Sequence, residues 1–271
     1  MRILRRRELP PLLRAIHDPP KRLYLRGAGE AALLAQVAVA IVGARACSPY
    51  GQQVARMLGR ELAAAGVVVV SGLARGIDGY AHRGALETDG HTVAVLGCGI
   101  DRDYPAPHSG LARAIAERSL LVSEYGPGIE PAPWRFPARN RIIAGLCAAT
   151  IVVEAREKSG ALITADFALE GGRDVFAVPG EITSALSAGT NALLRVGATP
   201  LTGTDDVLDA LGIERELPSV AESDPLIELL PASIDELAQK TGRAAAELAA
   251  ALAELELSGR VAEGEGVFRR S

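Results

Sequence analysis

Aromatic residues are scarce in this chain of 271 residues, at 4% of the total with a single Trp. Surfaces on which planar groups stack must therefore be few and local. Cysteine is almost as rare: Cys47, Cys98 and Cys147 are an odd number at wide spacing. This pattern predicts reduced, buried thiols rather than a disulfide framework.

Long apolar runs are also missing. The longest, such as residues 67–70, are far too short to span a bilayer, and no secretory h-region follows the basic start MRILRRREL. We therefore expect a cytoplasmic protein with no membrane partner.

Motifs for bound cofactors are absent as well. Gly43-Ala44-Arg45 stands where a dinucleotide-binding fold has G-x-G-x-x-G, and the Gly-x-Gly of residues 97–99 is followed by no third glycine. No G-x-x-x-x-G-K-[ST] loop for ATP occurs, and the four His residues show no metal-ligand spacing with cysteines. The sequence thus predicts no cofactor and no metal site.

Short apolar runs alternate with amphipathic stretches along most of the chain. In residues 51–66, Val54, Leu58 and Leu62 recur every four residues and Gly66 follows as a helix stop. Buried strands that alternate with such helices predict an α/β fold, a Rossmann-like, doubly wound and mostly parallel sheet. The expected strands are residues 37–42, 67–70, 92–96, 120–122, 150–153 and 175–178, with a short piece near Pro200.

Four segments follow from composition. Residues 1–35 form a short lead-in with two double prolines, 36–212 the Rossmann-like domain, 213–224 a linker and 225–271 a small C-terminal winged-helix domain. In the last segment we expect two helices, with Ser233 as an N-cap, and a hairpin that turns at residues 264–266.

The net charge of −4 is unevenly distributed. Residues 213–271 hold 12 Asp and Glu against 6 Lys and Arg, which leaves the α/β body at +2. The second helix of the small domain has almost no side chains suited to base edges, so we expect that domain to serve structure or protein contacts rather than DNA reading.

Glycine, hydroxyl and arginine side chains gather where strands lead into helices. Arg45 follows the first strand, Arg75 lies in the turn of residues 71–76, and Ser159-Gly160 and Gly189-Thr190-Asn191 open two later helices. Any one of these turns is what a tight connection requires. Four on one sheet edge, with arginines at two, favour phosphate binding at helix N-termini.

One connection, residues 123–142, is unusually long and rich in proline. It places Arg135, Arg139 and Arg141 beside Trp134 and Phe136. Long loops in compact domains are more often functional than accidental, and arginines beside aromatic rings suit backbone charge and base faces.

Catalytic candidates are few. Asp78 and His82, four apart on an expected helix, could act as a base and its orienting partner, but the simpler interpretation is preferred: Asp78 caps the helix start and His82 is a packed surface residue. Glu124, at the end of a strand, is an acid/base candidate or an ordinary loop residue, and both interpretations stay open.

Many separate motifs resemble one family, the DNA-processing protein A (DprA, also called Smf) proteins. In order they are VGARACSPYG, SGLARGIDGYAHRGAL, AVLGCGIDRDYP, SEYGPG, RFPARNRIIAGL, VVEAREKSGALITADFALEGGRDVFAVPG and GTNALLRVGA. The resemblance implies a non-enzymatic protein of natural transformation and recombination that binds single-stranded DNA with little sequence preference. It also implies loading of the recombinase RecA, DNA coated by single-strand binding protein as a possible target, and a homodimer.

On these motifs the resemblance places a DNA-binding pocket at the first turns, at residues 136–141 and at the turn of residues 159–160. Arg45 would hold a phosphate, Phe136 would meet a base face, and Arg139 and Arg141 would add charge. The expected site residues are Gly43, Arg45, Arg75, Phe136, Arg139, Asn140, Arg141, Ser159 and Gly160.

Two other functions remain as alternatives. A nucleoside-monophosphate phosphoribohydrolase shares the architecture, but its P-G-G-x-G-T motif is approached only by Pro179-Gly180-Glu181. An adaptor that binds only proteins is the other.

Overall fold

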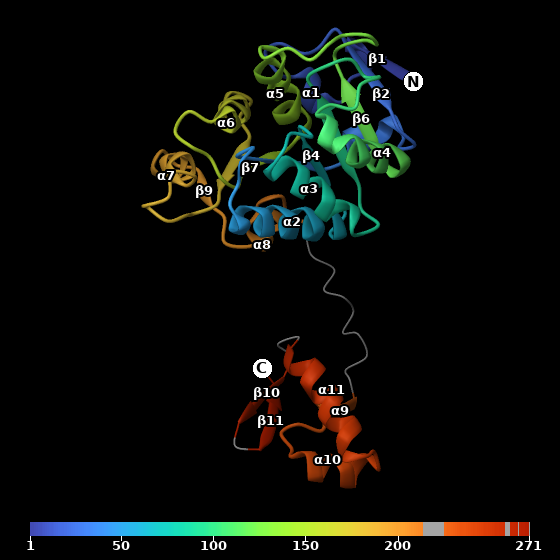
Figure 1. The fold of residues 1–271 in the computed structure, drawn as a ribbon, viewed down its shortest axis with the longest axis vertical. Helices are drawn as coiled ribbons and strands as arrows, with labels where there is room; N and C mark the ends of the chain where they lie inside the picture. The colour runs from blue at the N-terminus through green and yellow to red at the C-terminus, as the bar shows by residue number, and fades with distance from the viewer. Residues whose placement is uncertain (214–224, 258–260, 265, 271) are drawn as a thin grey trace. The chain divides into compact units, whose positions relative to one another are not determined.

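The computed structural model describes residues 1–213, 225–257, 261–264 and 266–270 (Figure 1). The chain divides into two compact units, Met1–Arg215 and Glu216–Ser271. Apart from Ile213, the predicted linker 213–224 lies outside the described residues. Within the described ranges, no helix combines the length and apolarity needed to cross a membrane.

A nine-stranded sheet forms the centre of the larger unit, in the order β1-β2-β6-β5-β4-β3-β7-β8-β9. Its seven parallel strands follow the predicted apolar runs, so the doubly wound, mostly parallel sheet is confirmed. They are β3 (Ala38–Val42), β4 (Val68–Ser71), β5 (Thr92–Leu96), β6 (Leu120–Ser123), β7 (Ala149–Val152), β8 (Asp174–Ala177) and β9 (Thr199–Pro200).

The lead-in contributes two strands that the sequence did not predict. β1 (Arg2–Arg5) pairs with β2 (Arg22–Arg26), and β2 pairs antiparallel with β6. Leu23 and Leu25 are fully buried, while their charged neighbours at either end face outward. This period-2 alternation was the available signal. Between the two strands lie η1 (Arg6–Glu8) and α1 (Pro11–Arg14), and η2 (Ala31–Ala35) follows β2.

Helices cover both faces of the sheet because alternate strand residues point to opposite sides. Val39 and Ile41 pack under α2 (Pro49–Ala64), α3 (Ile77–Leu86) and α8 (Asp205–Ala210). Ala40 and Val42 pack under α1, α5 (Arg135–Leu146), α6 (Gly160–Glu170) and α7 (Ala188–Arg195). η3 (Ala106–His108) leads into α4 (Ser109–Arg118), which packs near β5 and β6.

The smaller unit has its own apolar core, which includes Leu237, Leu248, Leu252 and Phe268. Its elements are α9 (Pro225–Glu228), α10 (Ile234–Thr241), α11 (Ala245–Leu257) and the hairpin of β10 (Val261–Gly264) and β11 (Val267–Arg270). Ser233 caps α10 as predicted: its Oγ accepts a hydrogen bond from the backbone N–H of Glu236. Two helices followed by a hairpin confirm the winged-helix prediction.

Candidate nucleic-acid interface

The strand order reverses between β3 and β7. From β3 the chain adds β4, β5 and β6 on one side, and β7, β8 and β9 then follow on the other. In open α/β sheets, ligands bind outside the carboxyl ends of the strands at such a switch point, since the two connections diverge there. Gly43 follows β3 and Gly160 begins α6 after β7, so two of the predicted turns border this crevice.

A cavity of about 250 Å³ opens at the switch point. We call it the switch-point cavity. Its lining includes seven of the nine predicted site residues: Gly43, Arg45, Phe136, Arg139, Asn140, Ser159 and Gly160. Arg75 lines an adjoining hollow of about 90 Å³ together with Tyr104. Arg45, Phe136 and Arg139 line both spaces, so the hollow lies next to the cavity.

The helix α5 begins at Arg135, inside the segment that the sequence analysis treated as a loop up to residue 142. That prediction was wrong because Pro137, read as a loop residue, lies in the first helical turn, where its missing N–H costs nothing. The helix brings Phe136, Arg139, Asn140 and Ile143 to one face, at spacing i, i+3, i+4, i+7, and all four line the cavity.

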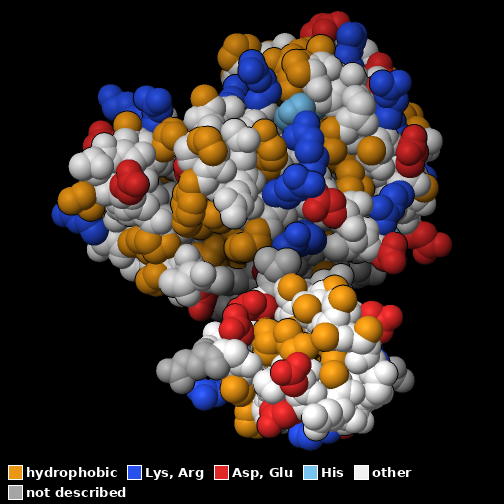
Figure 2. Space-filling model, turned by 60° about the horizontal axis from the view of Figure 1, so that its bottom comes forward, with side chains coloured by type: hydrophobic (Ala, Val, Ile, Leu, Met, Phe, Trp, Pro, Cys, Tyr) orange, Lys and Arg blue, Asp and Glu red, His pale blue; other side chains and the backbone are white. Residues whose placement is uncertain are grey.

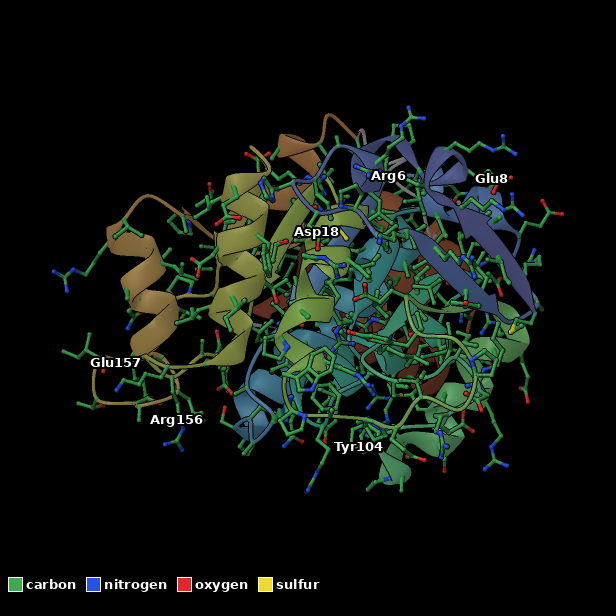
Figure 3. The ribbon with its side chains drawn as sticks, turned by 90° about the horizontal axis from the view of Figure 1, so that it is seen from above. Arg6, Glu8, Asp18, Tyr104, Arg156 and Glu157 are labelled. Carbon is green, nitrogen blue, oxygen red and sulfur yellow. The ribbon has the colours of Figure 1, made fainter. Side chains whose placement is uncertain are left out.

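Arg45 lies at the rim with its side chain exposed. Its guanidinium carbon lies 5.4 Å from the centre of the Phe136 ring, a cation–π contact. The other partner of Phe136 is Tyr104: the ring centres are 5.5 Å apart and the planes differ by 24°. In Figure 3, Tyr104 and Arg156 project from the same side of the larger unit, opposite Arg6 and Glu8. A charged and an aromatic surface thus adjoin at the cavity mouth.

Close packing holds the turn that carries Arg45. A Cβ atom on Gly43 would lie 2.6 Å from Cγ1 of Ile77 and 2.9 Å from the carbonyl oxygen of Glu154, so only glycine fits. The N–H of Ala44 donates to that same carbonyl oxygen at 2.7 Å. The buried carboxylate of Glu154 also accepts hydrogen bonds from the N–H and the hydroxyl of Ser48, the N-cap of α2. Sequence reasoning missed this role of Glu154.

Arg139 forms part of the cavity floor and is 3% exposed. Its Nη1 donates to the carbonyl oxygen of Gly72, at 2.8 Å, and to that of Val95. Burial lowers the pKa of Arg139 to about 10, against the opposing charge of Asp78, so the guanidinium stays protonated at neutral pH. Arg139 therefore joins β5 to the turn after β4 from beneath, where the prediction had it add free charge.

Asp78 is also buried, near enough to Arg139 for the two charges to affect each other. Its Oδ2 accepts hydrogen bonds from the N–H groups of Gly72 (3.1 Å) and Ala74 (3.3 Å). Burial raises the pKa of Asp78, and the charge of Arg139 together with these hydrogen bonds opposes the rise. The turn they hold is unusual: Leu73 has φ of 58°, which is uncommon for a residue other than glycine. Asp78 therefore does not cap α3 as predicted: Gly76 is the N-cap, without a side-chain hydrogen bond, and the Asp78 carboxylate holds the preceding turn instead.

His82 differs from its predicted place on the surface. It is fully buried, and its Nδ1 pairs with the hydroxyl of Thr92 at 2.7 Å, not with Asp78. Burial lowers the pKa of His82 to about 3. The imidazole is therefore neutral and lies in the protein interior.

The N-terminus of α6 forms the opposite wall. The hydroxyl of Ser159 accepts a hydrogen bond from the N–H of Ala161 (3.3 Å), which confirms that this turn caps a helix. The amide of Asn140 bridges the two walls, because its Nδ2 donates to the carbonyl of Gly160 at 3.1 Å and its Oδ1 accepts from Nε of Arg139 at 3.3 Å. Helix N-termini favour anions, so this wall suits a phosphate.

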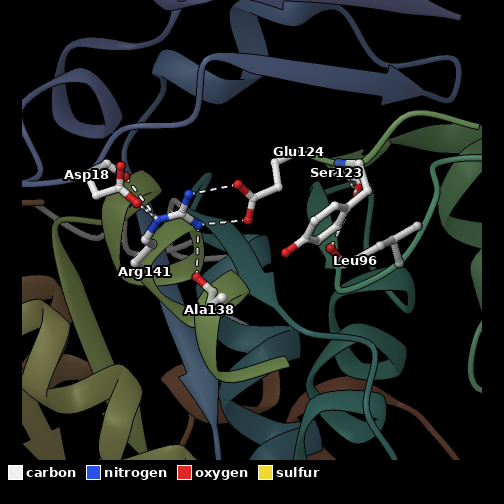
Figure 4. Close-up of polar contacts among 7 residues, drawn as sticks. Asp18, Leu96, Ser123, Glu124, Ala138 and Arg141 are labelled. Atoms are coloured by element: carbon white, nitrogen blue, oxygen red, sulfur yellow. Dashed lines mark hydrogen bonds and ion pairs between the residues drawn. The ribbon is translucent and has the colours of Figure 1, made fainter. Parts of the chain in front are cut away.

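Arg141 does not line the cavity. Figure 4 shows it bound to Asp18, Glu124 and Ala138 instead. It lies on another face of α5, with its side chain 12% exposed, and forms a bidentate ion pair with Glu124 at 2.8 and 2.7 Å. Its Nε donates to Asp18 of the lead-in at 3.1 Å. These two carboxylates pair with the positive charge of Arg141. The ion pair also gives Glu124 a structural role, which answers whether Glu124 is an acid/base group or an ordinary loop residue.

The fourth predicted turn, residues 189–191, is also internal. The N–H of Gly189 donates to the carbonyl of Ala155, and the hydroxyl of the buried Thr190 donates to the carbonyl of Ser187. Another hydroxyl, on Thr164, does line the cavity at 1% exposure. Its position one helical turn beyond Gly160 was the available sequence signal.

Two family models match the chain: DNA recombination-mediator protein A over residues 1–212, and the DprA winged helix domain over residues 219–266. The putative DNA processing protein DprA of Mycobacterium tuberculosis is 43% identical over an alignment that covers 93% of this chain and 69% of that protein. The DNA processing protein DprA of Streptococcus pneumoniae is 48% identical over 200 residues, or 72% of this chain and 68% of the relative.

A solved structure of DNA processing protein A from Helicobacter pylori, described for its single-stranded DNA binding mode, superimposes with a TM-score of 0.70 at 33% identity. The match covers 78% of this chain and 94% of that one. The resemblance that the sequence motifs carried is confirmed, and this chain belongs to the DNA recombination-mediator protein A family, the DprA/Smf proteins.

Proposed function

We propose that this protein is a non-enzymatic mediator that binds single-stranded DNA in the switch-point cavity. A role in DNA processing for recombination follows from its family. The observation that carries the proposal is the exposed Arg45 guanidinium, stacked on Phe136 and facing a cavity whose opposite wall is the N-terminus of α6.

The two walls suit the two parts of a nucleotide. Phosphate oxygens are attracted to Arg45, to Arg75 and to the amide groups that begin α6. A base meets Phe136 and Tyr104, which already stack on each other at the rim. Stacking and backbone charge do not distinguish base edges, so binding tolerates any sequence. A duplex hides its base faces, which is why we propose a single strand.

The proposed contacts are Gly43, Arg45, Arg75, Phe136, Asn140, Ser159 and Gly160. Arg139 serves them as a positioning residue, since its guanidinium is bound to two backbone carbonyl groups. We leave Arg141 out of the contacts because Glu124 and Asp18 neutralise it.

In this proposal the protein acts in the cytoplasm as a homodimer, and one strand can occupy both cavities. Linking two sites raises overall affinity without enlarging either. The bound strand is then delivered to RecA, including strands first coated by single-strand binding protein.

Fluorescence anisotropy with labelled oligo-dT and with mixed-sequence oligonucleotides tests the central claim. We expect similar dissociation constants for both single strands, weaker binding to duplex, and a loss of affinity as salt rises. An absence of binding to either single strand at low salt would refute the claim and favour the protein-only adaptor.

The enzyme alternative has its own assay. Asp78 is the carboxylate that lines the cavity among the described residues, and it is bound to two N–H groups beside Arg139. We expect no free base after incubation with AMP. Release of adenine would establish a phosphoribohydrolase instead.

The RecA step is tested separately. Strand exchange by RecA on DNA coated with single-strand binding protein should accelerate on addition of this protein. Unchanged rates, with DNA binding intact, would remove RecA loading from the proposal and leave the DNA site in place.

A further inference from the structure

A second basic hollow adjoins the switch-point cavity and shares Arg45 with it. Its volume is about 300 Å³, and its lining includes Arg75, Tyr80, Arg83 and His108. We call it the α3 hollow, because Gly76 caps α3 and both Tyr80 and Arg83 belong to that helix. It extends from the carboxyl edge of the sheet along α3.

The positive charge of the α3 hollow is uncompensated. Among the described residues, Arg45, Arg75 and Arg83 have no carboxylate oxygen within 4.0 Å, and no Asp or Glu lines the hollow. Three like charges without counterions create a field that attracts a polyanion. Elsewhere on this unit, Arg26, Arg102 and Arg118 each have an acidic partner.

Two basic side chains of the hollow, Arg83 and His108, are held in place. The guanidinium carbon of Arg83 lies 5.4 Å from the centre of the Tyr80 ring. Gly79 leaves the room for this arrangement: a Cβ atom there would lie 2.6 Å from Cε1 of His108 and 3.0 Å from Nη1 of Arg83. Nδ1 of His108 donates to the carbonyl of Leu73, which fixes the imidazole against the turn that carries Arg75. A side chain that is already ordered loses less entropy when it binds.

Beyond Arg83, the arginines on this surface have acidic partners. Figure 2 shows basic side chains in a band over α2 and α3, two helices whose long basic residues are all arginines. Gln52 and Tyr80 also line the neighbouring groove on α2, where Arg56 pairs with Glu87 and Arg60 lies 3.6 Å from Glu61. Each of those two arginines has an acidic partner, whereas Arg83 has none among the described residues.

We propose that a single strand held in the switch-point cavity continues through the α3 hollow, with its next phosphates on Arg75 and Arg83. This inference rests on the proposed function and extends it, because it gives the strand a direction across the protein and an end point. The Tyr80 ring lies against the Arg83 guanidinium and supports it. The contacts proposed here are to phosphates, so this part of the path does not read the base sequence.

The path predicts a dependence on oligonucleotide length. Arg83→Ala should leave the affinity for an oligo-dT of roughly 4 nucleotides unchanged, because such a strand fills only the cavity. For an oligo-dT of roughly 20 nucleotides the dissociation constant should rise about two- to fivefold, the effect of one exposed ion pair. The slope of log affinity against log salt should also fall by about 0.7. Arg83→Lys should restore most of the loss.

Arg195→Ala is the matched control. Arg195 is an exposed arginine in the last turn of α7, at the opposite edge of the sheet, and its loss changes the net charge by the same amount. Equal effects of Arg83→Ala and Arg195→Ala on the long strand, or an Arg83→Ala protein that binds both lengths like the parent, would overturn the path. Equal losses for both lengths would overturn it too, by placing Arg83 at the cavity. Failure of the parent to bind either strand would instead refute the proposed function.

Discussion

The guanidinium carbon of Arg45 lies 5.4 Å from the centre of the Phe136 ring, although the two residues come from different elements more than ninety positions apart. Arg45 follows β3, and Phe136 lies in the first turn of α5. The contact joins a positive charge to an aromatic face at the mouth of one cavity. Because the charge and the aromatic face belong to different residues, mutation can remove each of them separately.

Replacement of Arg45 should weaken binding to all sequences alike. Arg45→Ala removes one phosphate contact, so we expect the salt dependence of binding to oligo-dT to fall by about 0.7 in slope. Arg45→Lys should retain the slope but lose part of the affinity, because an ammonium lacks the planar surface that stacks on Phe136. Titrations at several salt concentrations measure both. An Arg45→Ala protein indistinguishable from the parent at every salt concentration would exclude this contact.

Replacement of Phe136 should have the complementary effect. Phe136→Ala removes a stacking surface and no charge, so binding should weaken by about 1–3 kcal/mol with the salt slope unchanged. Phe136→Tyr keeps the ring and should bind almost as the parent does. A lowered slope in Phe136→Ala would show instead that Phe136 acts mainly by holding Arg45.

Replacement of Asp78 and Arg139 tests whether these residues affect DNA binding by positioning the turn after β4 or by their charge. If electrostatics alone mattered, loss of Asp78 and Arg139 together, one charge of each sign, would leave DNA binding nearly unchanged. Because Asp78 and Arg139 hold the turn after β4, we expect the double variant Asp78→Asn/Arg139→Gln to bind more weakly than the parent.

The double variant is chosen because Asp78→Asn alone removes the negative charge that favours the buried, protonated Arg139, a change that destabilises the fold. Thermal unfolding first establishes that the double variant is folded. Unchanged or tighter binding by a folded double variant would contradict the positioning role.

Arg141 should affect stability and not DNA. Arg141→Ala leaves Glu124 largely buried without its bidentate partner, so the free energy of unfolding should fall by about 1–3 kcal/mol. The salt slope of DNA binding should stay at the parent value, in contrast to Arg45→Ala. Urea unfolding and anisotropy on the same samples measure the two quantities. A reduced slope with unchanged stability would return Arg141 to the set of DNA contacts.

His82 makes the fold sensitive to acid. Its pKa is about 3 in the folded protein and near 6.5 when the chain is unfolded, so below pH 6.5 the unfolded state binds a proton that the folded state does not. Stability contributed by neutral His82 is present above pH 6.5 and is lost as the pH falls, by roughly 1 kcal/mol per pH unit.

Urea unfolding at pH 7 and pH 5 tests this. His82→Gln keeps a polar side chain and cannot titrate, so its stability should fall less between the two pH values than that of the parent. Equal losses in both proteins would mean that other groups dominate the acid response.

The alternation of apolar strands with amphipathic helices determined the fold in advance, because each element must bury its own apolar face and neighbouring segments suffice to define it. The glycine and serine turns were predictable for the same local reason: Ser159 caps the helix that directly follows it. What the sequence analysis did not predict were the helix start at Arg135, the lead-in strands β1 and β2, and the burial of His82.

Which arginine is free for a ligand was decided by tertiary structure alone. Arg45, Arg139 and Arg141 are alike in sequence but differ in the structure. Arg45 is exposed and contacts an aromatic ring, and Arg139 is buried beneath a turn. Arg141 is bound to Glu124 and to Asp18. Their partners come from strands and turns far away along the chain. Charge availability depends on burial and on such distant partners, and no local pattern of residues contains that information.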